Sequence, residues 1–398
     1  MPLDLIQTLS ELIAIPSVNP MGLPLEGPEY LEGRVTNYLE RLFQSYRLPY
    51  ERQMVEPERE NIVARIGGGR SSDPKQLILF EAHQDTVPVT GMTIEPWTPV
   101  VSDGRIYGRG ACDIKGGLTA MLGAFVRLAE ERPEGMPTLV MACTVNEEHG
   151  FSGAAALESF WARSSPIIPR RPDAAVIAEP TSLNVVVAHK GVVRWRCHVL
   201  GRAAHSSQPH LGENAIFKMA RVLVALEQYQ RAVVGTLGDH PLCGTPTLSV
   251  GTIAGGMSVN IVPDRATIDI DRRLAPSEDP DIAREHVISY IAEHCAGVSV
   301  EHDPPFLAAA GLCDSDNGAL AASLSEAAHA VVGRCSSVGV PFGTNAAATA
   351  AAGIPSVVFG PGSIDQAHTA DEWLPIDELV SASEILYRFA RHGLNRAR

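Results

Sequence analysis

The 398-residue chain contains no apolar run near the ~20 residues that a membrane-spanning helix requires, so no membrane partner is expected. It also has no excess of basic residues. Lys and Arg total 32 against 46 Asp and Glu, which gives a formal net charge of −14. Nucleic acids and anionic membranes are bound through basic patches, and we therefore expect no nucleic-acid partner either.

The sequence also lacks a pattern of paired cysteines. Its seven cysteines are odd in number and scattered, which favours reduced thiols. The first 16 residues carry Asp4 and Glu11 within an amphipathic pattern, unlike a signal peptide. Together these features predict a cytoplasmic protein.

What the chain does contain is an alternation of short apolar runs and helical patterns, which is typical of α/β folds. Helices are expected at Ile114–Glu131 and at Gly318–Val332, where Gly333 ends the second. The apolar runs resemble buried parallel strands. They are Gln76–His83, Thr138–Val145, Asp173–Ala178 and Ile354–Phe359.

The middle of the chain has a different pattern. An alternating strand runs from about Val185 to Leu200, and a helix, two strands, a helix and a last strand follow. This β-α-β-β-α-β order predicts a ferredoxin-like α+β domain over residues 184–302. Residues 1–183 and 303–398 would then form one discontinuous, three-layer α/β/α domain with a mainly parallel sheet.

Side chains that can bind metal follow each expected parallel strand. In open α/β sheets the functional crevice lies at the carboxyl ends of the strands, so these residues should converge. They are His83 and Asp85, Glu147 and Glu148, Glu179, and His368, and Asp113 joins them before a helix.

Imidazoles and carboxylates without a cysteine pair suit zinc or a neighbouring divalent metal. Even if only five of these side chains are ligands, they are too many for one four-coordinate zinc ion. They fit two ions about 3.5–4 Å apart that share a carboxylate. Each residue alone has an ordinary interpretation: His83 as a surface or capping residue, Glu147 and Glu148 as a solvated pair, Asp113 as a helix cap. Their joint occurrence at successive strand ends favours the metal site.

Five motifs in order give the chain a resemblance to a known family. It resembles the di-zinc amidohydrolases and exopeptidases that include acetylornithine deacetylase, succinyl-diaminopimelate desuccinylase, aminoacylase and glutamate carboxypeptidase. Ala82 departs from the glycine common at that position, but both residues are small. The motifs are HQDTVP from His83, GRGACDIKGG from Gly108, NEEHG from Asn146, AEPTS from Ala178, and GPGSIDQAHTADE from Gly360.

The resemblance implies a role for each residue of this cluster. His83, Asp113 and Glu179 would surround one metal ion, while Asp113, Glu148 and His368 would surround a second, with Asp113 bridging. Glu147 would be the general base, and Asp85 would orient His83. Zinc is the expected metal, with cobalt or manganese as substitutes.

Further residues are implied in and beside the inserted domain. His205 would reach the active site of a neighbouring subunit, so a homodimer through the inserted domain is expected. Asn260 and Arg273 would bind substrate, and Gly343 and Thr344 would contact its carboxylate end. From the residues alone, Arg273 could equally form a surface ion pair with Asp271 or Asp269, and His205 could be a polar strand-end residue.

The activity implied is hydrolysis of the amide bond of a small N-acyl amino acid or short peptide by a metal-bridging hydroxide. The motifs resemble acetylornithine deacetylase most, and desuccinylase, other N-acyl amino acid hydrolase or carboxypeptidase activities remain as alternatives. A non-catalytic binding protein on the same fold is a remote alternative. The metal ligands cannot separate the hydrolases, because the deciding pocket residues lie on loops.

Overall fold

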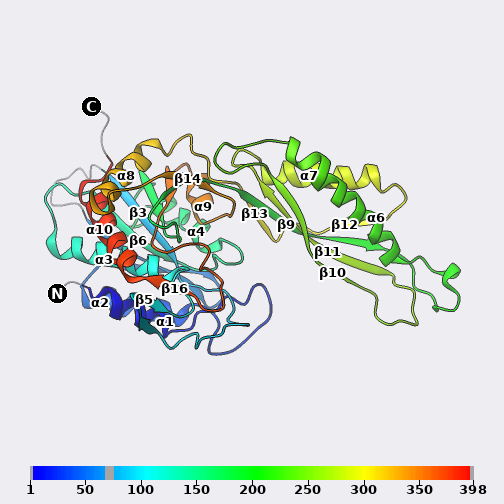
Figure 1. The fold of residues 1–398 in the computed structure, drawn as a ribbon, viewed down its shortest axis with the longest axis horizontal. Coiled ribbons are helices and arrows are strands. Elements are labelled where there is room, and N and C mark those ends of the chain that lie inside the picture. Colours follow the sequence, from blue (N-terminus) through cyan, green and yellow to red (C-terminus); the bar gives the residue numbers. More distant parts are fainter. Residues whose placement is uncertain (1–2, 68–75, 395–398) are drawn as a thin grey trace. The chain divides into compact units, whose positions relative to one another are not determined.

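Two sheets of different construction organise the chain in the computed structural model, which describes residues 3–67 and 76–394 (Figure 1). The large unit comprises the described residues of the ranges 1–187, 314–338 and 344–398. The small unit comprises Ala188–Cys313 and Gly339–Gly343. The sequence-based division into domains, with boundaries at 183/184 and 302/303, stays a prediction.

The sheet of the large unit is mixed, with a parallel centre. Strands β6, β3, β7 and β15 lie side by side and parallel, as the four apolar runs predict, while β1, β2 and β8 pair in antiparallel fashion. In sheet order the strands are β1 (Tyr50–Glu56), β2 (Arg59–Ile66), β6 (Thr138–Thr144), β3 (Leu77–His83), β7 (Ala174–Ile177), β15 (Ser356–Val358), β8 (Val185–His189) and β14 (Ser337–Val340).

Helices cover both faces of this sheet and make it the middle of three layers. Alternate strand residues such as Ile78 and Phe80 pack in one core with α1, α2, α3, α8 and α10. In addition, α4 contacts β1, and α9 contacts β7 and β15. The expected α/β/α class is confirmed. The helices are α1 (Leu5–Ile13), α2 (Gly33–Ser45), α3 (Lys115–Glu131), α4 (Ser152–Ala156), α5 (Glu158–Ala162), α8 (Gly318–Val332), α9 (Ala346–Ala351) and α10 (Ile376–His392).

The small unit has the β-α-β-β-α-β order that the sequence predicts. Its sheet has the order β10-β11-β9-β12, with β13 also paired to β9, and α6 and α7 share one core with it. The elements are β9 (Gly191–Leu200), α6 (Ala215–Gln228), β10 (Thr247–Gly255), β11 (Arg265–Leu274), α7 (Pro280–His294), β12 (Val300–His302) and β13 (Leu307–Ala309).

The prediction of one continuous strand from Val185 to Leu200 is wrong in its continuity. The chain breaks at Lys190 into β8, which pairs in the large sheet, and β9, which pairs in the small one. All five residues of β8 are buried, whereas β9 alternates over part of its length. The alternation at residues 193–199 is therefore a property of β9 alone.

A small three-stranded sheet, which the sequence did not reveal, lies in the large unit. Its order is β16 (Trp373–Pro375), β5 (Arg105–Tyr107) and β4 (Val100–Ser102). The register places Trp373 opposite Tyr107. This pairing brings the residues just before β16 beside the loop that follows β5.

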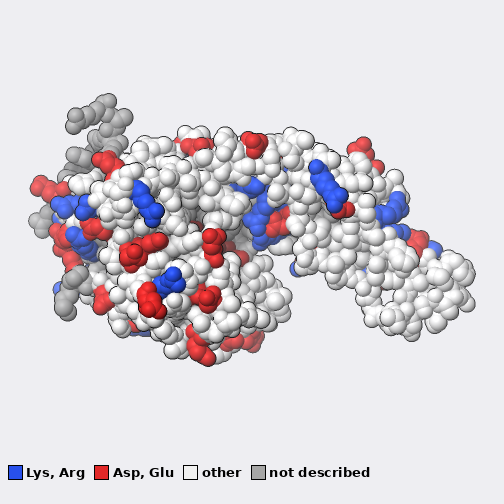
Figure 2. All heavy atoms as spheres, in the orientation of Figure 1, with Lys and Arg blue, Asp and Glu red and all other residues white. Residues whose placement is uncertain are grey.

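The charged side chains are interspersed on the face drawn in Figure 2, where lysine and arginine form small groups among acidic residues. Within residues 3–67 and 76–394, no helix is long and apolar enough to cross a membrane.

Candidate metal centre

The metal-binding candidates gather where neighbouring parallel strands end. His83 is the last residue of β3, Glu147 follows β6, and Glu179 follows β7. Because β6, β3 and β7 are adjacent and parallel, their carboxyl ends meet at one edge of the sheet. The side chains from these segments are therefore brought together, as the sequence pattern predicts.

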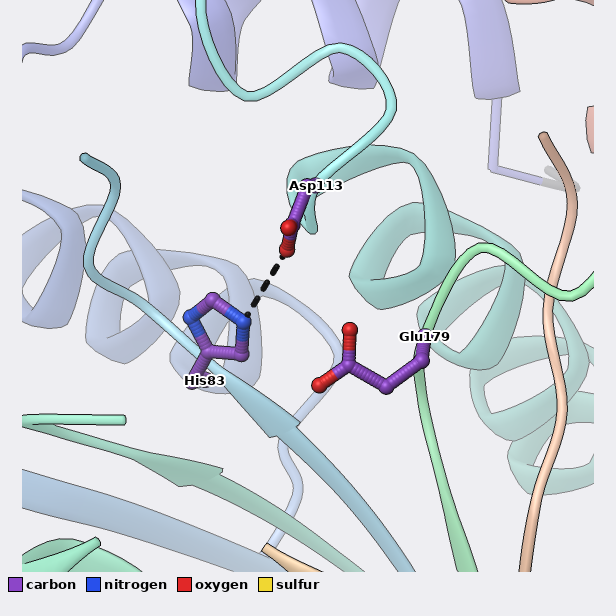
Figure 3. Close-up of side chains that lie close together, drawn as sticks. All are labelled: His83, Asp113 and Glu179. Carbon is purple, nitrogen blue, oxygen red and sulfur yellow. Dashed lines mark ion pairs between the residues drawn. The ribbon is translucent and has the colours of Figure 1, made fainter. Parts of the chain in front are cut away.

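One group of candidate ligands consists of His83, Asp113 and Glu179. One ligand atom from each residue lies within 4.8 Å of the others, and all three residues are buried. His83 Nε2 lies 3.3 Å from Asp113 Oδ1, and Figure 3 shows the Glu179 carboxylate directed toward this pair.

A second group consists of Asp113, Glu148 and His368, again with ligand atoms within 4.8 Å of one another. His368 Nε2 lies 3.2 Å from Asp113 Oδ2 and 3.4 Å from Glu148 Oε2. Asp113 belongs to both groups and turns one oxygen toward each histidine. This is the arrangement expected of a carboxylate that bridges two ions.

The donor set fits two divalent cations of the zinc type. Each group offers one imidazole nitrogen and carboxylate oxygens, which are ligands that zinc accepts. His83 Nε2, Asp113 Oδ1 and Glu148 Oε1 are buried and make no hydrogen bond within the part of the chain that is described. Buried polar atoms normally have partners, so these three atoms suit metal coordination.

The electrostatics of the site also call for positive charge. Burial, reinforced by neighbouring carboxylates, raises the pKa of Glu147 and Glu179 well above the usual range and that of Glu148 to about 7. The carboxylates of Asp113 and Glu148 raise the pKa of His368 to about 10. A bound divalent cation would compensate this concentration of negative charge.

Asp85 lies behind the candidate ligands. Its backbone oxygen lies 3.0 Å from His83 Nδ1, and its carboxylate is 3.5 Å from the same nitrogen. The carboxylate also accepts hydrogen bonds from the backbone N–H groups of Glu147 and Glu148, each at 3.1 Å. Asp85 thus contacts both the histidine and the glutamate loop, which is the position of a partner behind a metal ligand.

Asn19, which no sequence pattern singles out, supports this arrangement. Its side-chain nitrogen donates to Asp85 Oδ2 at 2.8 Å and to Asn146 Oδ1 at 3.0 Å. Burial alone raises the pKa of Asp85, but His83 and Asn19 outweigh burial and lower it to about 2. A lone asparagine in a turn-rich segment reveals such a contact only once the fold is known.

Glu147 belongs to neither ligand group, although it lies next to Glu148. It is 8% exposed, and its backbone follows Asn146, which has φ of +61°. Asparagine adopts this left-handed conformation more readily than most residues. Of the two adjacent glutamates, only Glu148 offers a ligand atom to the second group.

His205 and Asn260 lie in the small unit on neighbouring exposed segments. Ser206 N–H donates to the Asn260 backbone oxygen at 3.0 Å, and His205 Nδ1 lies 2.7 Å from Ser207 Oγ. Both His205 and Asn260 are exposed. The structure therefore brings these two residues into one surface region.

Arg273 lies near the opposite end of the small sheet from these two residues. It pairs with Val192, where the chain enters the small unit, whereas Arg265 at the start of the same strand pairs with Leu200. Its guanidinium forms an ion pair with Asp271, 2.8 Å from Nε to Oδ1. Within this unit, Arg273 does not meet His205 or Asn260.

Thr344 and Gly343 fall in different units. Thr344 is fully buried before α9, and its hydroxyl accepts a hydrogen bond from Ala346 N–H at 3.1 Å. Next to it, Asn345 donates to Glu81 Oε1 at 2.9 Å. Glu81 is a buried carboxyl group among the apolar residues of β3, and a charged residue in such a run is the one signal of this contact in the sequence.

Known proteins with similar sequences are amide hydrolases by name. The acetylornithine deacetylase of Myxococcus xanthus is 30% identical over 339 residues, which cover 84% of each chain. A probable succinyl-diaminopimelate desuccinylase of Staphylococcus epidermidis is 28% identical over 96% of each chain.

Solved structures share the fold at low identity. A metallo-carboxypeptidase of the M20 family from Sulfolobus solfataricus has a TM-score of 0.76 at 19% identity, with 98% of this chain and 99% of that chain covered. A dinuclear metal-binding peptidase from Bacillus subtilis has a TM-score of 0.66 at 18% identity, with 97% and 96% covered.

The fold and the site together define a metal-dependent hydrolase that acts on amide bonds. The sequence model of peptidase family M20/M25/M40 matches residues 79–392, which is most of the chain. The chain belongs to this family.

Proposed function

We propose that the protein removes a short acyl group from a small N-acyl amino acid, as an acetylornithine deacetylase does, with two zinc ions as cofactor. One observation carries the proposal: two groups of metal-binding side chains share Asp113, and the unshared Glu147 lies beside them. The similarity to the Myxococcus xanthus deacetylase supports the choice of substrate class.

His83, Asp113 and Glu179 would hold one ion, and Asp113, Glu148 and His368 the other. When bound, such ions supply the positive charge that polarises an amide carbonyl and acidifies water. Asp85 keeps His83 in orientation through its ring Nδ1, which leaves Nε2 directed at Asp113.

Glu147 acts as the general base in this mechanism. Its carboxylate accepts a proton from the attacking water and then delivers a proton to the departing amine. Glu147 is buried next to Glu148 but belongs to neither ligand group, so its carboxylate is free for both proton transfers.

Arg273 binds the carboxylate of the substrate through paired, charge-assisted hydrogen bonds. It already makes such bonds to Asp271, from Nε at 2.8 Å and from Nη2 at 3.3 Å. Asn260 donates to the substrate from its amide, and Gly343 and Thr344 contact the carboxylate end of the substrate.

His205 completes the active site of a partner subunit, where it holds the developing negative charge on the carbonyl oxygen. Its separation from Arg273 along the small sheet, which the neighbouring Asn260 shares, supports a role for both residues in the active site of the partner. The protein is therefore a homodimer, in which each subunit supplies His205 to the other.

The surface of the small unit supports this dimer. Strand β10 is an edge strand, and apolar side chains are exposed on it, on the loop after it and on α6. Contiguous exposed apolar surface marks sites of association. The exposed fractions are 60% for Ile253, 88% for Met257, 100% for Val259, 74% for Phe217 and 54% for Val224.

A substrate panel tests the proposed function. N-acetylornithine, N-succinyl-diaminopimelate, simple N-acyl amino acids and dipeptides would be offered to the zinc-loaded protein, to cobalt- and manganese-loaded protein, and to protein treated with chelator. Preference for N-acetylornithine, lost with chelator and restored by zinc, is expected. Preference for the succinylated substrate or for dipeptides would favour the desuccinylase or carboxypeptidase alternative, and no chelator-sensitive hydrolysis would refute the proposal.

A further inference from the structure

The Glu372 carboxylate lies entirely buried between two loops of the candidate metal centre. Its side chain is 0% exposed and accepts four hydrogen bonds. The donors are Arg109 Nη1 at 2.8 Å, Gly110 N at 2.9 Å, Cys112 N at 2.8 Å and Asp113 N at 2.9 Å. One carboxylate thus binds three backbone N–H groups of the loop that ends at Asp113.

The contacts of Glu372 continue through its backbone and through Arg109. Gly108 N–H donates to the Glu372 backbone oxygen at 3.0 Å, as the pairing of β5 with β16 requires. Arg109 Nη2 donates to the backbone oxygens of Pro88 at 3.2 Å and Thr369 at 3.4 Å. Arg109 therefore connects three segments: the one after His83, its own loop, and the one after His368.

These contacts reach the candidate ligands directly. The Asp113 N–H is held by Glu372, and the side chain of Asp113 turns its two oxygens toward His83 and His368. Glu372 lies four residues after His368, at the end of the same segment. Its position fixes the backbone of Asp113 and limits the movement of the segment that carries His368.

We propose that Glu372, held by Arg109, is a positioning residue that sets the distance between Asp113 and His368 and so prepares the second group for its metal ion. The inference rests on the proposed two-metal function. Loss of a group that orients a metal ligand typically weakens metal binding about 10- to 100-fold. Glu372 would act in this way through its hydrogen bond to the backbone N–H of Asp113, without contacting the metal or the substrate.

Zinc binding by the metal-free protein tests the proposal. Glu372→Gln keeps the shape of the side chain but presents an NH₂ group to backbone N–H donors. We expect the second zinc equivalent to bind about 10- to 100-fold more weakly in this variant, measured by competition with a chromophoric chelator. The absorption spectrum of the cobalt-loaded protein should change as well, because it reports the geometry around the metal.

Glu278→Gln serves as the matched control. Glu278 accepts hydrogen bonds from the fully buried Arg272 and from the Ala275 backbone N–H, both at 2.6 Å, but it lies in the small unit and contacts no candidate ligand. Loss of this carboxylate should lower the melting temperature without changing zinc affinity. A Glu372→Gln variant that behaves in the same way would overturn the proposal.

Arg109→Gln provides a second variant in case Glu372→Gln does not fold. It leaves Glu372 with its three backbone donors and removes the charged one. Weaker binding of the second zinc is expected, and unchanged affinity would reject the positioning role. A wild-type protein that binds no zinc would instead refute the proposed function, so the two failures can be told apart.

Discussion

Asp113 and His368 lie with Oδ2 and Nε2 only 3.2 Å apart, although they come from distant parts of the sequence. The other oxygen of Asp113 lies 3.3 Å from His83. A single carboxylate therefore connects the two groups of candidate ligands, and losing its charge should affect both metal ions at once.

Asp113→Asn is accordingly expected to bind fewer than two zinc equivalents and to lose nearly all activity. The amide nitrogen cannot coordinate zinc, so one of the two contacts is lost. Metal content measured after dialysis checks this expectation. Asp239→Asn, a change at an exposed position of the small unit, should keep both equivalents. Full metal content in Asp113→Asn would disprove the bridging role.

Substitutions of the neighbouring Glu147 and Glu148 should affect different properties of the enzyme, turnover in one case and zinc binding in the other. Glu147→Gln is expected to keep its zinc but lose about 10²- to 10⁴-fold in kcat, as is typical when a general base is removed. Glu148→Gln should instead lose zinc, because Glu148 belongs to the second ligand group. Metal analysis and kcat measured side by side distinguish the two residues. Near-normal turnover in Glu147→Gln would contradict its role as the base.

Mixed dimers can test whether His205 acts in the partner's active site. His205→Ala and Glu147→Gln should each be nearly inactive alone. After the two are unfolded and refolded together, half of the dimers should be mixed, and each mixed dimer should contain one intact site. The activity should then recover to about a quarter of the wild-type value. If His205 acted within its own chain, mixing would restore nothing.

Arg273 should determine substrate affinity more than chemistry. Arg273→Ala is expected to raise KM, with kcat/KM falling about 10- to 100-fold, because charged hydrogen bonds contribute roughly 1.5–3 kcal/mol. Arg273→Lys keeps the charge but not the paired geometry, so it should recover only part of the loss. Equal KM in all three proteins would favour the alternative in which Arg273 serves only the ion pair with Asp271.

His189 should make stability depend on pH. Burial lowers the pKa of this fully buried histidine to about 4, against 6.5 for an ordinary histidine. The unfolded chain therefore takes up a proton first as the pH falls. The contribution of His189 is fully present above pH 6.5 and declines between pH 6.5 and pH 4, by about 3 kcal/mol over the whole range.

Urea unfolding at several pH values would measure this effect as a difference between two proteins. His189→Gln has no titrating side chain at this position, so its free energy of unfolding should fall less than that of the wild type as the pH is lowered. Parallel curves for the two proteins would show that His189 does not titrate as expected.

Much of the fold was predictable because buried parallel strands have a distinctive sequence. The runs that form β3, β6, β7 and β15 are almost wholly apolar, since both faces of the sheet are covered. The small sheet with strands β16, β5 and β4 was missed because its strands are short and are exposed or half-buried at most positions. Unlike the equally short β15, which is wholly buried, they do not lie in long apolar runs.

The candidate ligands could be predicted because parallel strands must end at a common edge. The residues behind them could not, because their effect depends on contacts between segments. Asn19 reaches Asp85, and Glu372 reaches the backbone of Asp113, across long separations in sequence. A buried asparagine or glutamate in a loop carries no periodic signal of such a partner.

Strand β15 lies between β7 and β8 in the large sheet, although the long segment Ala188–Cys313 of the small unit separates it from both in sequence. A ribosome therefore synthesises the two neighbours of this strand, and then the whole small unit, before the strand that joins them exists. His368 and Glu372 emerge later still. Until β15 is synthesised, β7 and β8 lack the strand that pairs with both, and a chain truncated before residue 356 would leave their facing edges unpaired.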